Sequence, residues 1–133
     1  MTARARAKQP LVIPEAVTHR IEIPNCTPPR LNQLMHCHWA VAQKRKNSWT
    51  RVVRLFSVHV PEAKGKRRVK LTVTLSPRMR SGDVDAYWKA TLDSLVLLSL
   101  LVDDNHKWAE IVPVVFERGA ERKTVIELED MES

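Results

Sequence analysis

Three aspartates in the second half of the sequence have the type and spacing to hold a metal ion. Asp83 and Asp85 are separated by one residue, and Asp104 follows after a largely apolar stretch. Carboxylate oxygens are hard ligands that suit Mg²⁺ or Mn²⁺ better than Zn²⁺. An ion held this way can activate water and neutralise phosphate oxygens. We therefore expect Asp83, Asp85 and Asp104 to bind Mg²⁺, with Mn²⁺ as the alternative, and to support phosphodiester hydrolysis.

Lys89 lies one helical turn beyond Asp85 and would stand beside such a metal site. There it could stabilise the charge that develops on a phosphate in the transition state. Each residue also has a plainer role, because Lys89 could form an ion pair with Asp85 or Asp93 worth only about 0.3–0.5 kcal/mol. Asp83 could simply cap a helix. The spacing of two aspartates alone does not decide between these roles.

The charges of the chain are strongly segregated. Residues 1–82 carry 17 Lys and Arg against 3 Asp and Glu, whereas residues 83–133 carry 5 against 12. A basic part gathers a polyanion, and an acidic part can hold the divalent metal that phosphate chemistry uses. The alternative is an ordinary basic protein with an acidic tail. On the first interpretation, nucleic-acid contacts are expected from Lys44, Arg45, Lys46, Arg51, Arg54, Lys66, Arg67, Arg68 and Lys107.

Hydrophobic periodicity predicts six elements that must position these residues. In chain order they are strand 19–23, helix 31–58, strand 69–75, helix 83–100, and strands 108–117 and 123–129. Gly119 between the last two indicates a hairpin, and Pro113 an edge or a bulge. The order β-α-β-α-β-β predicts an α/β (α+β) fold with one mixed sheet and two main helices. Residues 1–18 are expected to be a flexible basic arm, and 19–133 one small domain.

The apolar residues of the two predicted helices suggest how the helices are buried. Trp39, Trp49 and Trp88 fall on apolar stripes and are expected in the core. The apolar run from Leu97 to Leu101 indicates either deep burial or a subunit interface. Trp108 is expected in the core, with stacking against a base as the alternative.

The segment from Gly82 to Leu95, with Leu101-Val102-Asp103-Asp104 after it, resembles the signature of the RusA family of Holliday junction resolvases. That signature reads D-x-D-N-x-x-K-x-x-L-D-x-L, followed by a hydrophobic stretch and D-D. Its catalytic aspartates match Asp83, Asp85 and Asp104, and its lysine matches Lys89. Upstream, residues 28–32 (P-P-R-L-N) are similar to the family's P-P-x-x-N. The chain departs from the pattern at Ala86, where the family usually has Asn, and loss of a supporting hydrogen bond there could lower activity.

The resemblance covers roughly residues 19–130 and implies a Mg²⁺-dependent endodeoxyribonuclease. Such an enzyme binds four-way DNA junctions and cuts two strands in recombination and repair. Symmetric cutting favours a homodimer with a two-fold axis. Two alternatives stay open: a non-catalytic protein that binds structured DNA, and a nuclease of the same chemistry that acts on flap DNA or RNA.

Several other classes are excluded by composition. No stretch approaches the ~20 apolar residues of a membrane span, so we expect no membrane partner. Three glycines are too few for a glycine-rich nucleotide-binding loop. Cys26 and Cys37 give no disulfide framework, and with no secretory signal they favour a cytoplasmic protein. Three consecutive helical residues at 36–38 (H-C-H) point about 100° apart, which argues against zinc binding.

Overall fold

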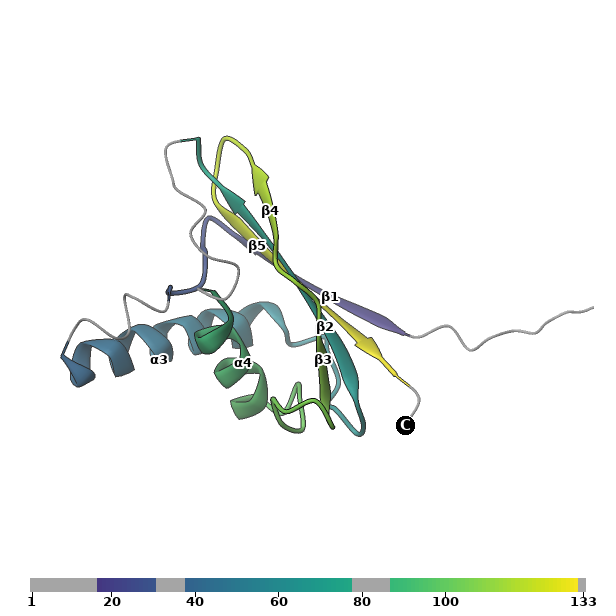
Figure 1. Cartoon of the computed structure of the whole chain (residues 1–133). Coiled ribbons are helices and arrows are strands. Elements are labelled where there is room, and N and C mark those ends of the chain that lie inside the picture. The colour runs from purple at the N-terminus through teal and green to yellow at the C-terminus, as the bar shows by residue number, and fades with distance from the viewer. Residues whose placement is uncertain (1–16, 31–37, 78–86, 132–133) are drawn as a thin grey trace, which may run out of the picture.

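Alternating burial along three strands builds the centre of a five-stranded mixed sheet (Figure 1). The computed structural model describes residues 17–30, 38–77 and 87–131. Strand β1 (Thr18–Pro24) pairs antiparallel with β5 (Lys123–Asp130), and β5 pairs antiparallel with β2 (Arg67–Leu75). On its other edge β2 pairs in parallel with two short strands, β3 (Ala109–Ile111) and β4 (Val115–Arg118). The fold is therefore the α+β class that the sequence predicts.

Two helices cover one face of this sheet (Figure 1). Helix α3 (Trp39–Phe56) begins where the His38 side chain accepts a hydrogen bond from the Ala40 N–H at 3.2 Å. Helix α4 (Trp88–Leu97) is joined to it by a hydrogen bond between the Thr50 and Ser94 hydroxyls at 2.6 Å. The helix predicted over residues 31–58 is present as α3 over residues 39–56, and residues 31–37 lie outside the described part of the chain.

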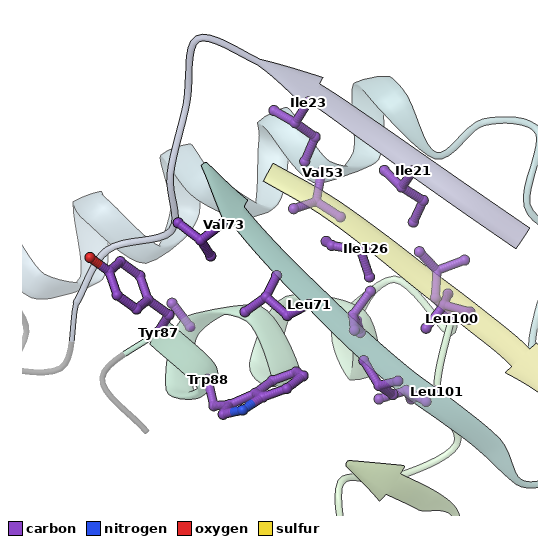
Figure 2. Packing of buried hydrophobic residues seen from close by; sticks show 14 of the residues in the cluster. Ile21, Ile23, Val53, Leu71, Val73, Tyr87, Trp88, Leu100, Leu101 and Ile126 are labelled. Atoms are coloured by element: carbon purple, nitrogen blue, oxygen red, sulfur yellow. The ribbon is translucent and has the colours of Figure 1, made fainter. Parts of the chain in front are cut away.

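The core lies between these helices and the sheet, as Figure 2 shows. Each strand contributes every second residue, as the pleat requires. Ile21 and Ile23 come from β1, Leu71 and Val73 from β2, and Ile126 from β5, all fully buried. No helix of the described structure lies on the other face of the sheet (Figure 1), where charged side chains such as Arg68 and Glu129 pair, as is usual for a sheet that is largely antiparallel.

The predicted hairpin around Gly119 is wrong. Strands β4 and β5 do not pair with each other, because β2 lies between them and pairs with both. The connection crosses the end of β2, where the Gly119 N–H donates to the Leu75 carbonyl at 3.1 Å. A Cβ on Gly119 would lie 3.0 Å from Thr74 Cγ2, so glycine serves this close approach. Pro113 does mark an interruption, since it separates β3 from β4 on the sheet edge.

The second helix and its apolar end also differ from expectation. Helix α4 ends at Leu97, and the chain turns at Ser99, which is exposed and has a φ of 63°. The turn returns Leu100 and Leu101 to the core, while Leu97 is 71% exposed. Trp49 and Trp88 are buried as predicted, but Trp39 is 75% exposed, so its assignment to the core is wrong. No helix in the described part of the chain is long and apolar enough to cross a membrane.

Candidate functional site

The acidic turn after α4 gives its two aspartates different tasks. Asp103 closes the turn, because its carboxylate accepts from the Asp104 N–H at 2.7 Å and from the Asn105 side chain at 3.1 Å. The Asn105 side chain in turn accepts from the Lys107 N–H at 3.0 Å. Asp104 is exposed, and its carboxylate forms no hydrogen bond or ion pair with another described residue. Asp104 is therefore the member of the pair whose oxygens are open to an ion.

Lys89 forms one of the ion pairs predicted for it. Its ammonium lies 3.5 Å from the Asp93 carboxylate, one helical turn away, and the side chain is more than half exposed. Lys46 of α3 reaches the same Asp93 oxygen at 3.3 Å. Asp93 thus links the two helices through ion pairs with a lysine of each. An exposed pair of this kind contributes little to stability, so Lys89 can exchange Asp93 for a phosphate at small cost.

Asp83 and Asp85, with Ala86, lie outside the described residues. Helix α4 starts three residues after Asp85, and the turn that carries Asp104 follows its other end (Figure 1). Among the described residues, no three His, Cys, Asp or Glu side chains converge on a metal position.

Arg67 cannot bind nucleic acid as predicted. Its side chain is 2% exposed, donates to Asp130 at 2.6 Å and donates to the Leu100 carbonyl at 3.0 Å. Asp130 also contacts His19 at 3.0 Å. Burial alone raises the pKa of Asp130, but the hydrogen bonds from Arg67 and His19 outweigh it and lower that pKa below its ordinary value. Arg67 is a structural cation because it sits at an inward position of β2.

Arg68 alternates with Arg67 and so points to the open face of the sheet. There it donates to Glu110 of β3 and, at 2.7 Å, to Glu129 of β5. These two carboxylates raise the pKa of Arg68. Its charge is balanced by two acids, which would have to be displaced before a phosphate could bind. The prediction that Arg68 contacts nucleic acid finds no support in this arrangement.

Two predicted contacts lie near Asp104. Lys66 lines a shallow hollow of about 360 Å³ together with Asp104, His106 and Glu110. The Lys107 ammonium lies 5.2 Å from the centre of the Trp108 ring, within the range of a cation–π contact. Trp108 is only half-buried, so its ring belongs neither fully to the core nor fully to the surface.

The remaining predicted contacts lie on α3. This helix has five basic residues and no acidic one, and Lys44, Arg45, Arg51 and Arg54 are exposed. Lys44 and Arg45 also line a hollow of about 540 Å³. We name this hollow the α3 pocket. Its walls are residues 26–30, one side of α3, Tyr87 and Arg122.

The α3 pocket was not predicted from the sequence, although two signals pointed to it. Pro28, Pro29 and Arg30 belong to the segment that resembles the family's P-P-x-x-N, and they form one wall. Leu31 and Asn32 of that segment lie outside the described residues. Tyr87 follows the predicted aspartate pair by two residues and forms the opposite wall. Both signals appear in the sequence, but only the fold brings them together.

Two buried polar atoms in the pocket wall have no hydrogen-bond partner in the described structure: Trp49 Nε1 and the Tyr87 hydroxyl. Trp49 is 4% exposed and Tyr87 is fully buried. Figure 2 shows the Tyr87 hydroxyl pointing out of the core toward the segment that follows β1. Burial raises the pKa of Tyr87, against an opposing effect from Arg30 and Arg118. The hydroxyl is therefore a neutral donor at physiological pH with positive charge near it.

Comparison with protein-family models and with curated proteins finds no match to this chain. The resemblance to the RusA family therefore depends on the quoted residues and their spacing. Within the described structure, the acidic turn after α4 and the basic helix α3 are the two features that bear on it.

Proposed function

We propose that this chain is a Mg²⁺-dependent endonuclease that binds and cuts branched DNA, with a four-way junction as its substrate. The observation that supports this most directly is the different bonding of the two aspartates after α4. The Asp103 carboxylate accepts two hydrogen bonds within its own turn. The Asp104 carboxylate, which matches the third catalytic aspartate of the family signature, accepts none from another described residue and can bind an ion. Asp83 and Asp85 are the other two proposed ligands, and Mn²⁺ is the alternative ion.

The donor set fits a divalent ion with a preference for oxygen ligands. Carboxylates are what Mg²⁺ binds in proteins, and an exposed one such as Asp104 leaves room for the waters that Mg²⁺ keeps. When bound, the ion would supply charge neutralisation and a more acidic water. Lys89, exposed at the start of α4, would add positive charge beside the phosphate.

The basic surface of α3 supports a nucleic-acid substrate. Its five cations lie within a stretch of eleven residues, without any acidic residue in the helix. Such a surface binds phosphate by releasing counterions, which makes binding depend steeply on salt. A four-way junction offers two equivalent strands, so we propose that a homodimer presents two sites related by a two-fold axis.

The experiment that tests this function is cleavage of a labelled four-way junction with Mg²⁺. Wild type should give paired, symmetric nicks. Asp83→Asn and Asp104→Asn should each slow cleavage by at least about 10²-fold while binding is kept, because loss of a ligand exceeds the 10–100-fold cost of losing a residue that only supports one. Asp103→Asn is the matched control: the new amide oxygen can still accept from the Asp104 N–H, and cleavage should stay within about threefold.

The two ligand variants are read separately because Asp83 precedes α4 in the sequence and Asp104 follows it. If only Asp83→Asn abolishes cleavage, Asp104 is not a ligand. If wild type binds the junction but never cuts it, the chain is a non-catalytic DNA-binding protein, the alternative that Ala86 favours. Duplex, flap, single-stranded DNA and RNA substrates in the same assay decide between junction cleavage and the same chemistry on another substrate.

A further inference from the structure

The α3 pocket combines an apolar wall with a rim of cations. Pro29, Val41 and Val52 supply apolar surface, and Lys44, Arg45 and Arg122 supply positive charge. No acidic side chain is among the described residues that line it. Its volume of about 540 Å³ falls within the ~300–1,000 Å³ of ligand pockets. A ligand that fits this chemistry has a flat apolar part and a negatively charged part.

We propose that the α3 pocket receives one unpaired nucleotide of a DNA strand, with its phosphate at Lys44 and its base against Pro29 and Val52. This choice of ligand depends on the proposed action on branched DNA. A nucleotide is the repeating unit of the polyanion that α3 attracts, and it has the required flat part and charged part. Bases in a continuous duplex are stacked and cannot enter a pocket without leaving the stack. A branch point already interrupts stacking, so entry there costs least.

Basic residues continue from the edge of the pocket along one side of α3. Lys44, Ser48 and Arg51 succeed one another at spacings of four and three along α3, so they share one side of the helix. Lys44 and Arg51 are exposed and make no ion pair with another described residue. A strand with one nucleotide in the pocket could therefore place its next phosphate on Arg51.

The unpartnered donors of the pocket wall give a second, independent reason for a ligand. A buried donor without an acceptor is costly to the fold, and native proteins leave few of them. Here the two residues that carry such atoms, Trp49 with its Nε1 and Tyr87 with its hydroxyl, both line the same hollow. A nucleotide carries acceptors on its base, sugar and phosphate. These acceptors could receive hydrogen bonds from the two donors if the side chains of the wall shift slightly. Folding alone does not explain why both donors lack an acceptor.

The test uses the full-length protein in buffer with EDTA, so that it reads binding without any cleavage. The probe is a four-way junction with 2-aminopurine next to the branch point, and the same sequence as a continuous duplex is the reference. Unstacking of 2-aminopurine raises its fluorescence several-fold. Wild type should raise it on the junction and leave the duplex signal unchanged.

Filling the pocket should remove that signal. Ser48→Trp adds a large side chain at an exposed position that lines the pocket, and Asn47→Trp adds the same side chain on the neighbouring exposed position outside the lining. We expect Ser48→Trp to weaken junction binding about tenfold, the size of losing one stacked base, and to abolish the fluorescence rise. Asn47→Trp should match wild type in both measurements. Circular dichroism of both variants verifies that α3 is intact.

Three outcomes overturn the proposal. The first is a fluorescence rise that Ser48→Trp and Asn47→Trp leave equally intact. The second is no rise with wild type on a junction that it binds. The third is equal or tighter binding of a matching RNA junction, which would assign the pocket to RNA. Because all of these are read without metal, failure of the endonuclease proposal would show only in the cleavage assay, and failure of the pocket proposal only here.

Discussion

The two faces of the domain use their positive charges in opposite ways. On the open face of the sheet, basic residues lie near acidic ones on a neighbouring strand: Arg68 beside Glu110 and Glu129, Lys123 beside Glu22, and Arg20 and Lys70 opposite Glu127. On α3 there are five basic residues and no acidic one. Lys46 pairs with Asp93 of α4 at 3.3 Å, whereas Lys44 and Arg51 form no ion pair with another described residue. The sheet face is thus nearly neutral locally, whereas α3 is strongly positive.

This difference separates cations that hold the fold together from cations that are open to a ligand. A phosphate that binds Arg68 must compete with two carboxylates already in place, and a phosphate that binds Lys44 displaces mainly water and counterions. Net charge alone cannot make this distinction, because Arg67, Arg68 and Lys70 count the same as the cations of α3. The predictions below test the division, from the largest expected effect to the smallest.

Removing two charges from each face gives the most direct comparison. Lys44→Ala with Arg51→Ala should weaken binding to a four-way junction by at least about 100-fold, since each charge-assisted contact to phosphate is worth roughly 1.5–3 kcal/mol. The slope of log Kd against log salt should fall by about 1.8. Arg20→Ala with Lys70→Ala removes the same charge from the sheet face and should change Kd by about twofold. Fluorescence anisotropy at several salt concentrations measures both, and equal losses would refute the division.

Loss of the ion pair of a structural cation should lower stability and leave DNA binding unchanged, the reverse of the effect expected for the cations of α3. Asp130→Ala leaves Arg67 buried with only the Leu100 carbonyl as its partner. We expect the free energy of unfolding to fall by about 2–3 kcal/mol, less than for a fully buried pair because Asp130 is partly exposed. Junction binding below the unfolding transition should stay within about twofold. Glu127→Ala, on the open face, is the control and should change stability by less than about 0.5 kcal/mol. Urea denaturation followed by tryptophan fluorescence measures both.

The same ion pair predicts the direction of pH dependence. The pKa of Asp130 is lowered in the folded state, so its carboxylate contributes stability above its unfolded pKa of about 3.9. That contribution should be lost as the pH falls through the lower, folded pKa. The difference in unfolding free energy between wild type and Asp130→Asn should therefore be full at pH 6 and shrink below about pH 4. A difference that grows as the pH falls would mean that the pKa of Asp130 is raised.

The order of elements was predictable, but the pairing of the strands was not. The alternation of Val69, Leu71 and Val73 against polar neighbours sets β2 and its buried face whatever the surroundings. A glycine such as Gly119 between two predicted strands is expected in a hairpin turn, but it is equally expected where the backbone passes close to another strand. Only the position of β2 between β4 and β5 distinguishes these uses. The burial of Arg67 has the same origin, because local sequence does not show that Asp130, 63 residues away, will meet it.

The candidate site was predictable residue by residue but not as an assembly. Asp104 and Lys89 stand out by their spacing, and the structure adds that Asp103 is used by its turn. The α3 pocket joins residues 26–30, α3 and Tyr87, which are far apart in the chain. Hydrophobic periodicity predicts the helices and strands of these segments but does not show that they pack around a cavity. Long-range packing decides that part of the site.

The smallest expected effect concerns the unpartnered hydroxyl in the pocket wall. Tyr87→Phe keeps the ring and its edge contact with Phe116, whose centroid lies 5.6 Å away, and removes a buried donor that has no described partner. We expect unchanged stability or a gain of up to about 1 kcal/mol, because no hydrogen bond is lost and the desolvation cost of the hydroxyl disappears. Thr91→Val is the matched control of opposite sign. It removes a buried hydroxyl that donates to the Tyr87 carbonyl at 3.1 Å and should cost about 1 kcal/mol.

Junction binding by the same Tyr87→Phe variant tests whether the hydroxyl contacts a ligand. If the hydroxyl serves a ligand, Tyr87→Phe should weaken junction binding about threefold to tenfold while stability holds or rises. Thr91→Val should lower stability and leave binding unchanged. A Tyr87→Phe variant that loses more than about 1 kcal/mol of stability would show that the hydroxyl is bonded within the fold. In that case the α3 pocket would keep its cations and its apolar wall but lose the donor that gives it polar selectivity, and Trp49 Nε1 would be the remaining donor in the wall with no described partner.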